Sequence, residues 1–207
     1  MKNIRDEAIV WVQLVTLIVI WVVILQVTQT PLQINAEAIK KLPDVVTVYM
    51  ALYVLFTRWG WRLKIFRGWL VPFPDLTGTW KGALITTWKN PETGETPPPV
   101  DIRLVIRHYF NRISCVLYTA ESMSWSTAAT LYGNDDDAIQ RLSYTYFNQP
   151  KAAVRDRSNI SNGAAVFRII EGKDRRLEGQ YWTDRKTTGD VALTFRDRST
   201  QEEALNT

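Results

Sequence analysis

The sequence has little of what catalytic and metal sites usually contain. Its 207 residues include one cysteine, Cys115, and one histidine, His108. A single cysteine excludes an intramolecular disulfide and any cluster of Cys ligands for zinc, and it fits a reducing compartment. There is no Gly-x-Ser-x-Gly motif and no phosphate-binding glycine loop. We therefore expect a protein that is not an enzyme and that needs no cofactor.

Two polar features remain as candidates for chemistry. His108 stands in the segment His-Tyr-Phe-Asn, which predicts a turn, and a general base there needs a nucleophile that the sequence does not place beside it. The run Asp135, Asp136 and Asp137 supplies carboxylates, but it lacks the further spaced oxygen ligands of a Ca²⁺ site and indicates a turn. We predict no catalytic residue and no metal ligand.

Charge is absent from a long stretch near the N-terminus. Residues 8–27 read AIVWVQLVTLIVIWVVILQV, twenty residues without a charged side chain. At about 1.5 Å per residue such a helix spans the roughly 30 Å of a bilayer core, which predicts a transmembrane helix. A cleaved signal peptide is the alternative, because residues 36–38 (Ala-Glu-Ala) resemble a cleavage site; the apolar run is, however, longer than a signal peptide needs.

A second apolar run, VVTVYMALYVLFT over residues 45–57, is shorter and lies between Asp44 and Arg58. As a helix it reaches only about 20 Å, so it crosses a bilayer only if Arg58 extends its charge to the interface. A buried helix of a soluble domain is the alternative. Because the run follows the first one closely, we expect a two-helix transmembrane hairpin.

Positive charges flank the outer ends of this predicted hairpin. Two Lys and Arg precede the first run, two lie between the runs and four follow the second: Lys2 and Arg5; Lys40 and Lys41; Arg58, Arg62, Lys64 and Arg67. The positive-inside rule then places the N-terminus and the rest of the chain in the cytoplasm, with the hairpin in the membrane as a multi-pass protein. Within the first run, Gln13 and Thr16 share one helix face and are predicted contacts between membrane helices.

The net charge of +4 belongs entirely to the N-terminal part. Residues 1–74 hold eight of the 25 Lys and Arg and four of the 21 Asp and Glu, which leaves 17 of each in residues 75–207. A balanced C-terminal part does not favour binding of a long nucleic acid, which needs an extended basic surface. A small anionic ligand held by a few cations remains compatible with it.

Long amphipathic helices are missing beyond Pro72 and Pro74. Hydrophobicity instead alternates with a period of two, which is typical of strands. Turn residues separate eight predicted strands, at 78–88, 100–107, 113–120, 124–132, 139–147, 164–170, 177–183 and 189–196. Such strands predict a closed barrel or a sandwich, and we favour the barrel because closure removes the sheet edges.

The expected protein is a membrane-anchored all-β protein, with two N-terminal transmembrane helices followed by an eight-stranded antiparallel lipocalin-like β-barrel. The predicted parts are the hairpin over residues 1–70, a Pro-rich linker over 71–74, a cytoplasmic ligand-binding barrel over 75–198 and a tail over 199–207. The Gly-x-Trp start at Gly78 resembles the first strand of lipocalins, and Trp80 is predicted to fill one end of the barrel.

Four segments strengthen this picture: FPDLTGTWKG at 73–82, SMSWSTAATLYG at 122–133, LSYTYFNQP at 142–150 and LEGQYWTDRKTTGDVAL at 177–193. With the two apolar runs, they resemble the membrane-anchored β-barrel effectors of bacterial CBASS antiphage operons, the SMODS-associating two-transmembrane β-strand family, over residues 8–197. The resemblance implies a receptor for a cyclic oligonucleotide, in the first place a dinucleotide, made by a partner CD-NTase. It also implies homo-oligomerisation on activation and disruption of the inner membrane, leading to abortive infection.

Side-chain chemistry, rather than a family motif, predicts the ligand-binding residues. A cyclic dinucleotide offers two phosphates to arginine, two bases to aromatic rings and several edges to hydroxyl groups. The predicted set combines these types: Trp80, Ser122, Ser124, Tyr144, Tyr146, Tyr181, Thr183, Arg185 and Thr187. Plainer interpretations stay open, namely a solvated turn for Arg185, exposed sheet for the serines and core packing for the tyrosines.

Three functions therefore remain at the level of the sequence. The first is a ligand-gated, membrane-disrupting receptor of antiphage defence. The second is a membrane-anchored, lipocalin-like carrier of a lipid or another hydrophobic ligand, and the third is a membrane scaffold without a ligand. The polarity of the barrel interior separates the first two, because Arg, Ser, Thr and Tyr favour a nucleotide whereas Leu, Ile and Phe without Arg favour a lipid.

Overall fold

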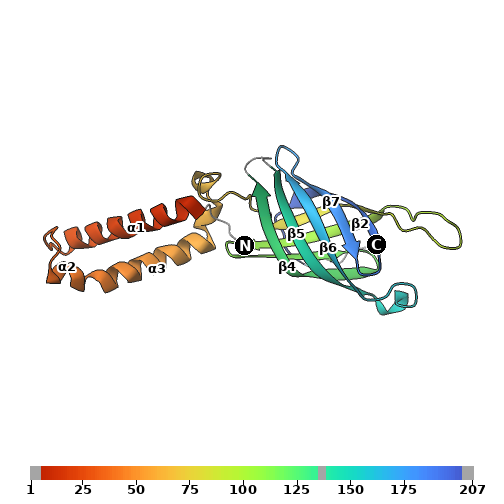
Figure 1. Ribbon diagram of the computed structural model, residues 1–207, viewed down its shortest axis with the longest axis horizontal. Helices are drawn as coiled ribbons and strands as arrows, with labels where there is room; N and C mark the ends of the chain where they lie inside the picture. Colours follow the sequence, from red (N-terminus) through yellow and green to blue (C-terminus); the bar gives the residue numbers. More distant parts are fainter. Residues whose placement is uncertain (1–5, 135–138, 202–207) are drawn as a thin grey trace. The chain divides into compact units, whose positions relative to one another are not determined.

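The structure is a computed structural model that describes residues 6–134 and 139–201 of the chain. These residues form two compact units. The barrel unit holds residues 75–108 and the chain from 112 onward, and the helical unit holds the residues up to 74 together with 109–111. Figure 1 shows the helices of one unit and the strands of the other.

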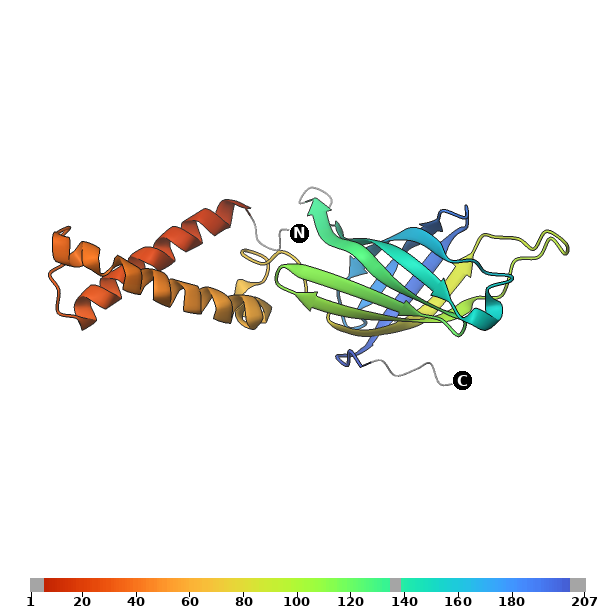
Figure 2. The same cartoon turned by 90° about the horizontal axis from the view of Figure 1, so that it is seen from below.

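Eight strands make up the barrel, and each pairs with its neighbours along the chain until β8 closes on β1. Their bounds are β1 Gly78–Thr86, β2 Val100–Tyr109, β3 Arg112–Tyr118, β4 Ser122–Asn134, β5 Ile139–Pro150, β6 Ser161–Ile170, β7 Arg176–Thr183 and β8 Thr188–Asp197. The β1–β8 pairing is antiparallel, and Figure 2 shows the closed wall from a second side. The predicted eight-stranded antiparallel barrel is confirmed, with strand ends that differ by up to a few residues.

Alternation along each strand separates the barrel core from its surface, as a period of two requires. On β1, Trp80 is buried whereas the following Lys81 is exposed. The other strands contribute a compact set of fully or almost fully buried side chains: Ile102, Leu104, Ile106, Leu142, Phe167, Leu177 and Leu193. This apolar layer is the main favourable contribution to the stability of the barrel, because burial of a large apolar side chain is worth about 1.5–3 kcal/mol.

Two glycines allow adjacent strands to approach closely inside this core. A Cβ atom added at Gly82 would lie 1.9 Å from the carbonyl oxygen of Ala192, and one added at Gly179 would lie 1.9 Å from that of Val166. Real Cβ atoms do not come so near a backbone oxygen, so a side chain at either position would push the strands apart. Glycine at these points lets the wall curve into a barrel of eight strands.

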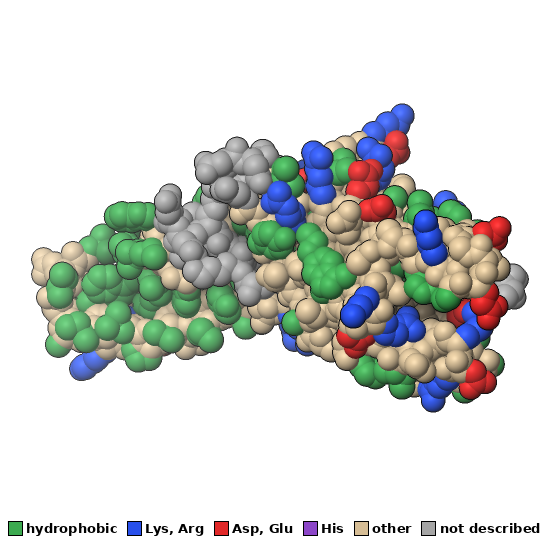
Figure 3. Space-filling model, turned by 45° about the vertical axis from the view of Figure 1, so that its right-hand side comes forward, with side chains coloured by type: hydrophobic (Ala, Val, Ile, Leu, Met, Phe, Trp, Pro, Cys, Tyr) green, Lys and Arg blue, Asp and Glu red, His purple; other side chains and the backbone are tan. Residues whose placement is uncertain are grey.

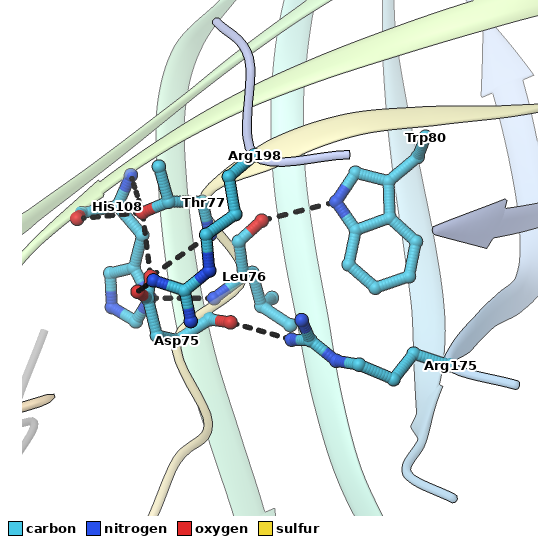
Figure 4. A network of polar contacts seen from close by, with 7 residues as sticks. All are labelled: Asp75, Leu76, Thr77, Trp80, His108, Arg175 and Arg198. Atoms are coloured by element: carbon cyan, nitrogen blue, oxygen red, sulfur yellow. Dashed lines mark hydrogen bonds and ion pairs between the residues drawn. The ribbon is translucent and has the colours of Figure 1, made fainter. Parts of the chain in front are cut away.

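A polar network lies at the end of the barrel where β1 begins (Figure 4). The Asp75 side chain accepts hydrogen bonds from the backbone N–H and the hydroxyl of Thr77, at 2.9 and 2.6 Å. The Leu76 N–H donates to His108 Nδ1 at 3.3 Å, and the Arg175 guanidinium donates to the Asp75 carbonyl at 2.5 Å. These bonds fix the chain just before β1, and they place the buried Leu76 side chain within the barrel unit.

Trp80 is fully buried next to this network. Its indole Nε1 donates to the carbonyl oxygen of Leu76 at 3.0 Å, its ring meets that of Phe195 edge to face at 5.2 Å, and the Arg175 guanidinium lies 5.3 Å from its centre. A side chain held by a hydrogen bond, a ring contact and a cation–π contact is well suited to fill a barrel end.

The helical unit consists of α1 (Asp6–Val27), α2 (Ala36–Lys40) and α3 (Leu42–Arg58), followed by two short 3₁₀ turns at Gly60–Arg62 and Lys64–Phe66. Figure 1 shows α1 and α3 side by side and antiparallel. Asn35 caps α2 by accepting a hydrogen bond from the Ala38 N–H at 2.8 Å, and the Trp21 indole donates to the Ala38 carbonyl at 3.3 Å. These bonds hold the connection between the two long helices.

Apolar side chains cover the surface of the helical unit, whereas charged side chains are spread over the barrel (Figure 3). Among the described residues, Val10–Val27 is the one helical segment long and apolar enough to cross a bilayer, and only 11% of it is buried. A core helix of a soluble domain is mostly buried, so this exposure fits a lipid-facing helix better.

The second predicted span needs correction. The run over residues 45–57 does form a helix, α3, but this helix has 17 residues and includes Asp44 and Arg58 near its ends. At about 1.5 Å per residue it is about 26 Å long, short of the roughly 30 Å of a bilayer core. Over residues 6–134 and 139–201 the structure therefore gives one membrane-length helix, not the two that the sequence predicted, and it does not support a multi-pass arrangement.

Gln13 and Thr16 both line an apolar groove of about 430 Å³ within the helical unit. Its other walls are mainly aromatic and aliphatic, with Tyr49, Leu52, Tyr53, Leu55, Phe56, Phe66, Leu70 and Phe110 among them. The two polar side chains therefore share one face of α1, as their spacing predicts. Their contact with other membrane helices stays a prediction.

Candidate functional site

The barrel encloses a cavity of about 700 Å³. On β1 the lining residues are Leu84 and Thr86, which follow Trp80 along the strand, so the cavity occupies the part of the barrel away from the Trp80 end. The volume is that of a pocket for a small organic ligand. The barrel is thus filled by side chains at one end and hollow toward the other.

Hydroxyl and amide side chains form the largest polar group in the lining of this cavity. They come from five strands and from the connections between strands: Thr86, Asn90, Thr119, Ser122, Ser124, Asn148, Ser158, Ser161, Thr183 and Thr187. Several of these side chains bond to one another. The hydroxyls of Thr183 and Thr187 are 2.6 Å apart, and those of Thr119 and Ser122 are 3.1 Å apart. Ser161 is different, because its buried hydroxyl has no hydrogen-bond partner among the described residues. A polar ligand that bonds to this hydroxyl would remove the free-energy cost of leaving it unpaired.

Aromatic rings form the second component of the lining. Tyr144 and Tyr146 from β5 lie with their ring centres 5.8 Å apart, and Tyr144 lies 5.9 Å from Phe167 of β6. Two glycines make room for such rings, because a Cβ at Gly163 would lie 2.5 Å from the Tyr146 hydroxyl. A Cβ at Gly189 would lie 2.6 Å from the Tyr181 ring. Flat surfaces of this kind are what nucleobases stack on.

The hydroxyls of Tyr144 and Tyr146 are neutral at physiological pH. Burial raises the pKa of Tyr144 well above its ordinary value. Burial also raises the pKa of Tyr146, and Tyr181 adds to this increase while the positive charge of Arg185 opposes it. Both hydroxyls therefore remain hydrogen-bond donors rather than anions, which suits a pocket for a negatively charged ligand.

Three charged side chains of the described residues lie at the cavity, and connections between strands carry them. Arg185 comes from the β7–β8 turn, Arg157 from the segment between β5 and β6, and Glu121 from the β3–β4 turn. Arg157 pairs with Glu121 at 2.5 Å. Arg185 donates to the Ser158 hydroxyl at 3.4 Å and to the Asn159 carbonyl at 3.2 Å.

Eight of the nine predicted ligand-binding residues line this one cavity: Ser122, Ser124, Tyr144, Tyr146, Tyr181, Thr183, Arg185 and Thr187. The ninth, Trp80, is buried at the other end of the barrel and is not among the lining residues. The structure thus brings together side chains from β4, β5, β7 and the β7–β8 turn. That they bind a ligand stays a prediction.

Several lining residues escaped the sequence analysis. Trp88, Glu121, Asn148 and Ser161 carried no signal of their own, because their proximity depends on how the barrel closes. Arg157 had a weak signal, since a basic segment between two strands is suited to cover a barrel mouth. Ser126 extends the row of Ser122 and Ser124 in sequence but does not line the cavity: the β4–β5 register shifts next to it, and its hydroxyl accepts a hydrogen bond from the Cys115 N–H.

His108 has a structural role in this fold. It lies within β2, not in the turn that the sequence predicted, and it is almost fully buried. Its Nδ1 accepts the Leu76 N–H, so that nitrogen is already used by the backbone (Figure 4). The described residues contain no group of three or more His, Cys, Asp or Glu side chains placed to bind a metal ion. The run Asp135–Asp137 lies outside the described residues.

Comparison with known proteins identifies the barrel. A family model described as "Cap15, cyclic dinucleotide receptor domain" matches residues 71–195, more than half of the chain. The chain belongs to this family. The Cap15 family is a family of receptor domains and not a known catalytic family. The matched residues run from just before β1 to within β8.

A comparison with an individual protein supports the same family. The chain is 29% identical over 148 residues to the CD-NTase-associated protein 15 of Staphylococcus schleiferi. The aligned region covers 72% of this chain and 75% of the relative. The recognition of a CBASS-type cyclic nucleotide receptor from sequence segments is thereby confirmed at the level of the family.

Proposed function

We propose that this protein is a membrane-anchored effector of CBASS antiphage immunity, whose barrel senses a cyclic dinucleotide made by a partner CD-NTase. The observation that supports this most is the cavity: a pocket of about 700 Å³, lined by two arginines, three tyrosines and eight Ser or Thr side chains, within a Cap15 receptor domain. A lipid carrier would need a mainly aliphatic pocket, and a scaffold without a ligand would need no polar cavity.

The proposed roles follow from the side chains. Arg185 and Arg157 hold phosphates through charge-assisted hydrogen bonds. Tyr144, Tyr146 and Tyr181 stack on or flank the bases. The hydroxyls of Ser122, Ser124, Thr183 and Thr187 bond to base edges and sugars, as does the unpartnered hydroxyl of Ser161. Trp80 supports the barrel from its closed end and does not touch the ligand.

Ligand binding is expected to raise the melting temperature of the protein. A ligand that binds only the folded state adds about 2.7 kcal/mol of stability at a hundredfold excess over its Kd. The test is a thermal-shift panel of cyclic di- and trinucleotides with the full chain in detergent micelles. Arg185→Ala should weaken binding by about 1.5–3 kcal/mol, the range for a hydrogen bond to a charged group. Arg176→Ala, on the same hairpin but outside the cavity, is the matched control.

A panel that leaves the melting temperature unchanged contradicts the proposal. Fatty acids and phospholipids belong in the same panel, because a shift with these ligands alone would favour the lipid carrier instead.

We further propose that α1 anchors the chain in the bacterial inner membrane, with the barrel in the cytoplasm, where the nucleotide is made. The end of α3 supports this orientation. Arg58 lies over the Trp59 ring at 5.9 Å and Arg62 over the Trp61 ring at 5.1 Å, and Lys64 and Arg67 follow in sequence. Tryptophan and basic residues together are typical of the cytoplasmic membrane interface.

Activation, in this proposal, brings several copies together and the crowded membrane helices then disrupt the bilayer. A ligand shifts such an equilibrium only through its higher affinity for the assembled form. Gln13 and Thr16 are suited to bonds between helices of neighbouring copies, each worth about 0.6–2 kcal/mol in a membrane.

Gln13→Leu should therefore keep membrane insertion and nucleotide affinity but reduce ligand-triggered dye release from vesicles by severalfold. The measurement uses protein reconstituted in liposomes, with the cyclic dinucleotide added outside. Val19→Leu, a change on an exposed apolar position of the same helix, is the control. Equal dye release from the Gln13→Leu protein and the unaltered protein would show that Gln13 makes no such contact.

A further inference from the structure

The mouth of the cavity holds one negative charge, and its position is unexpected in a pocket for an anion. Among the described residues that line the cavity, Glu121, Arg157 and Arg185 are the charged ones, so the lining carries a formal charge of about +1. Glu121 reduces the attraction that two arginines would otherwise exert on phosphate. A group that opposes binding of every anion needs a different explanation.

The two arginines are engaged very differently. Arg157 pairs with the Glu121 carboxylate at 2.5 Å, whereas the partners of Arg185, Ser158 and Asn159, are neutral and more distant. A phosphate that reaches Arg185 replaces weak acceptors. A phosphate that reaches Arg157 must compete with a carboxylate, and the stronger, charge-assisted bond is the harder one to replace.

The position of Glu121 in the turn is well defined. Its backbone N–H donates to the Thr119 hydroxyl at 3.1 Å, and its carbonyl accepts the Lys151 N–H at 2.8 Å. These bonds join the β3–β4 turn to the start of the segment that carries Arg157. The fold therefore holds the backbone of Glu121 beside the cavity, and the ion pair with Arg157 holds its carboxylate there.

From this arrangement we propose that Glu121 is a specificity-determining residue that makes the cavity discriminate against nucleotides with a terminal phosphate. This inference rests on the proposed function. Both phosphates of a cyclic dinucleotide are diesters with one negative charge each. Opening one of them gives a linear dinucleotide whose terminal phosphate alone carries about −1.5 to −2 at pH 7. The repulsion from Glu121 grows with this charge, so it penalises the linear product more than the cyclic messenger.

The consequence is a receptor that responds to the intact messenger and not to its hydrolysis product, although both carry the same two bases. The shapes of the two molecules also lead to different affinities, but Glu121 adds a difference in affinity that depends on charge and therefore on ionic strength. Because the pair is exposed to solvent, the effect is of moderate size and is screened by salt.

The experiment compares Glu121→Gln with the unaltered full chain in detergent, by titration calorimetry with cyclic di-AMP, cyclic di-GMP and their linear products pApA and pGpG. At low salt the substitution should tighten cyclic binding about threefold and linear binding about tenfold, in line with the contribution of a solvent-exposed charge. The preference for the cyclic form then falls about threefold, and this change shrinks as salt is raised. Glu121→Ala should reproduce it.

The matched control is Glu178→Gln. Glu178 pairs with Arg176 at 2.9 Å in a similarly exposed ion pair, but neither residue lines the cavity, so both affinities should stay unchanged. If the cyclic dinucleotides bind and Glu121→Gln leaves the protein's preference for cyclic over linear dinucleotides unchanged, this inference is wrong while the proposed function stands. If none of the four nucleotides binds the unaltered chain, both fall together.

Discussion

Deletion of residues 1–70 is expected to abolish killing of cells that make the cyclic dinucleotide, while the remaining barrel still binds it. The membrane-length segment Val10–Val27 lies within the deleted part, and the barrel unit contains the whole cavity lining. A receptor without its anchor has no means of damaging a bilayer. The measurements are colony survival and membrane potential in cells that express the partner nucleotidyltransferase, and the thermal shift of the fragment from residue 75 onward.

A second variant separates anchoring from the specific helix surface. In it the order of the residues in 10–27 is permuted, so that the overall hydropathy is kept while Gln13 and Thr16 move to other helix positions. It should insert in the membrane but kill less efficiently. Cell death caused by the fragment without residues 1–70 would place the toxic output in the barrel and overturn the proposed mechanism.

Replacement of Trp80 by Ala is expected to lower the free energy of unfolding of the barrel by about 3–5 kcal/mol, the range for loss of a large buried aromatic side chain. The indole is fully buried, and its removal also breaks the hydrogen bond to the Leu76 carbonyl and the contacts with Phe195 and Arg175. Urea denaturation of the fragment from residue 75 onward gives this value directly.

Trp80→Phe tests whether the residue also contributes to the cavity. It keeps a ring but loses the indole hydrogen bond, and should cost about 1–3 kcal/mol because the Leu76 carbonyl is left unpaired. Nucleotide affinity should not change, since Trp80 does not line the cavity. Trp182→Ala, at an exposed position of β7, should alter stability little. A selective loss of affinity in Trp80→Phe would show that the residue acts on the ligand, directly or through the barrel wall.

The candidate site illustrates how far reasoning from single strands reaches. Tyr144 and Tyr146 were assigned to one face because alternate residues of a strand share a face, and both line the cavity. The same reasoning places Ser122, Ser124 and Ser126 on one face, but Ser126 does not line the cavity: its hydroxyl bonds to the Cys115 N–H, and the β4–β5 register shifts just after it. Such irregularities depend on the neighbouring strand, which a local pattern does not include.

The ion pair at the cavity shows a second limit of sequence reasoning, which concerns contacts between residues far apart in the chain. Glu121 and Arg157 are 36 positions apart and stand in different connections, and they meet only because β4 and β5 are paired along their length. Trp80 was assigned both to the barrel end and to the ligand, and a strand pattern alone cannot separate these two ends of the same face. The number of membrane helices was misjudged because the second apolar run lies close to the first in sequence, whereas α3, with 17 residues, stays short of a membrane span.

The sequence by itself indicated the eight strands and the family, and it favoured a closed antiparallel barrel over a sandwich. Apolar runs, the period of two and turn residues are local properties, and each acts over a few neighbouring residues. The tertiary structure alone decided which end of the barrel is filled and which is hollow, and which charges from distant connections face the cavity. These features depend on strand register and closure, which bring together residues far apart in the chain, and no local pattern encodes that proximity.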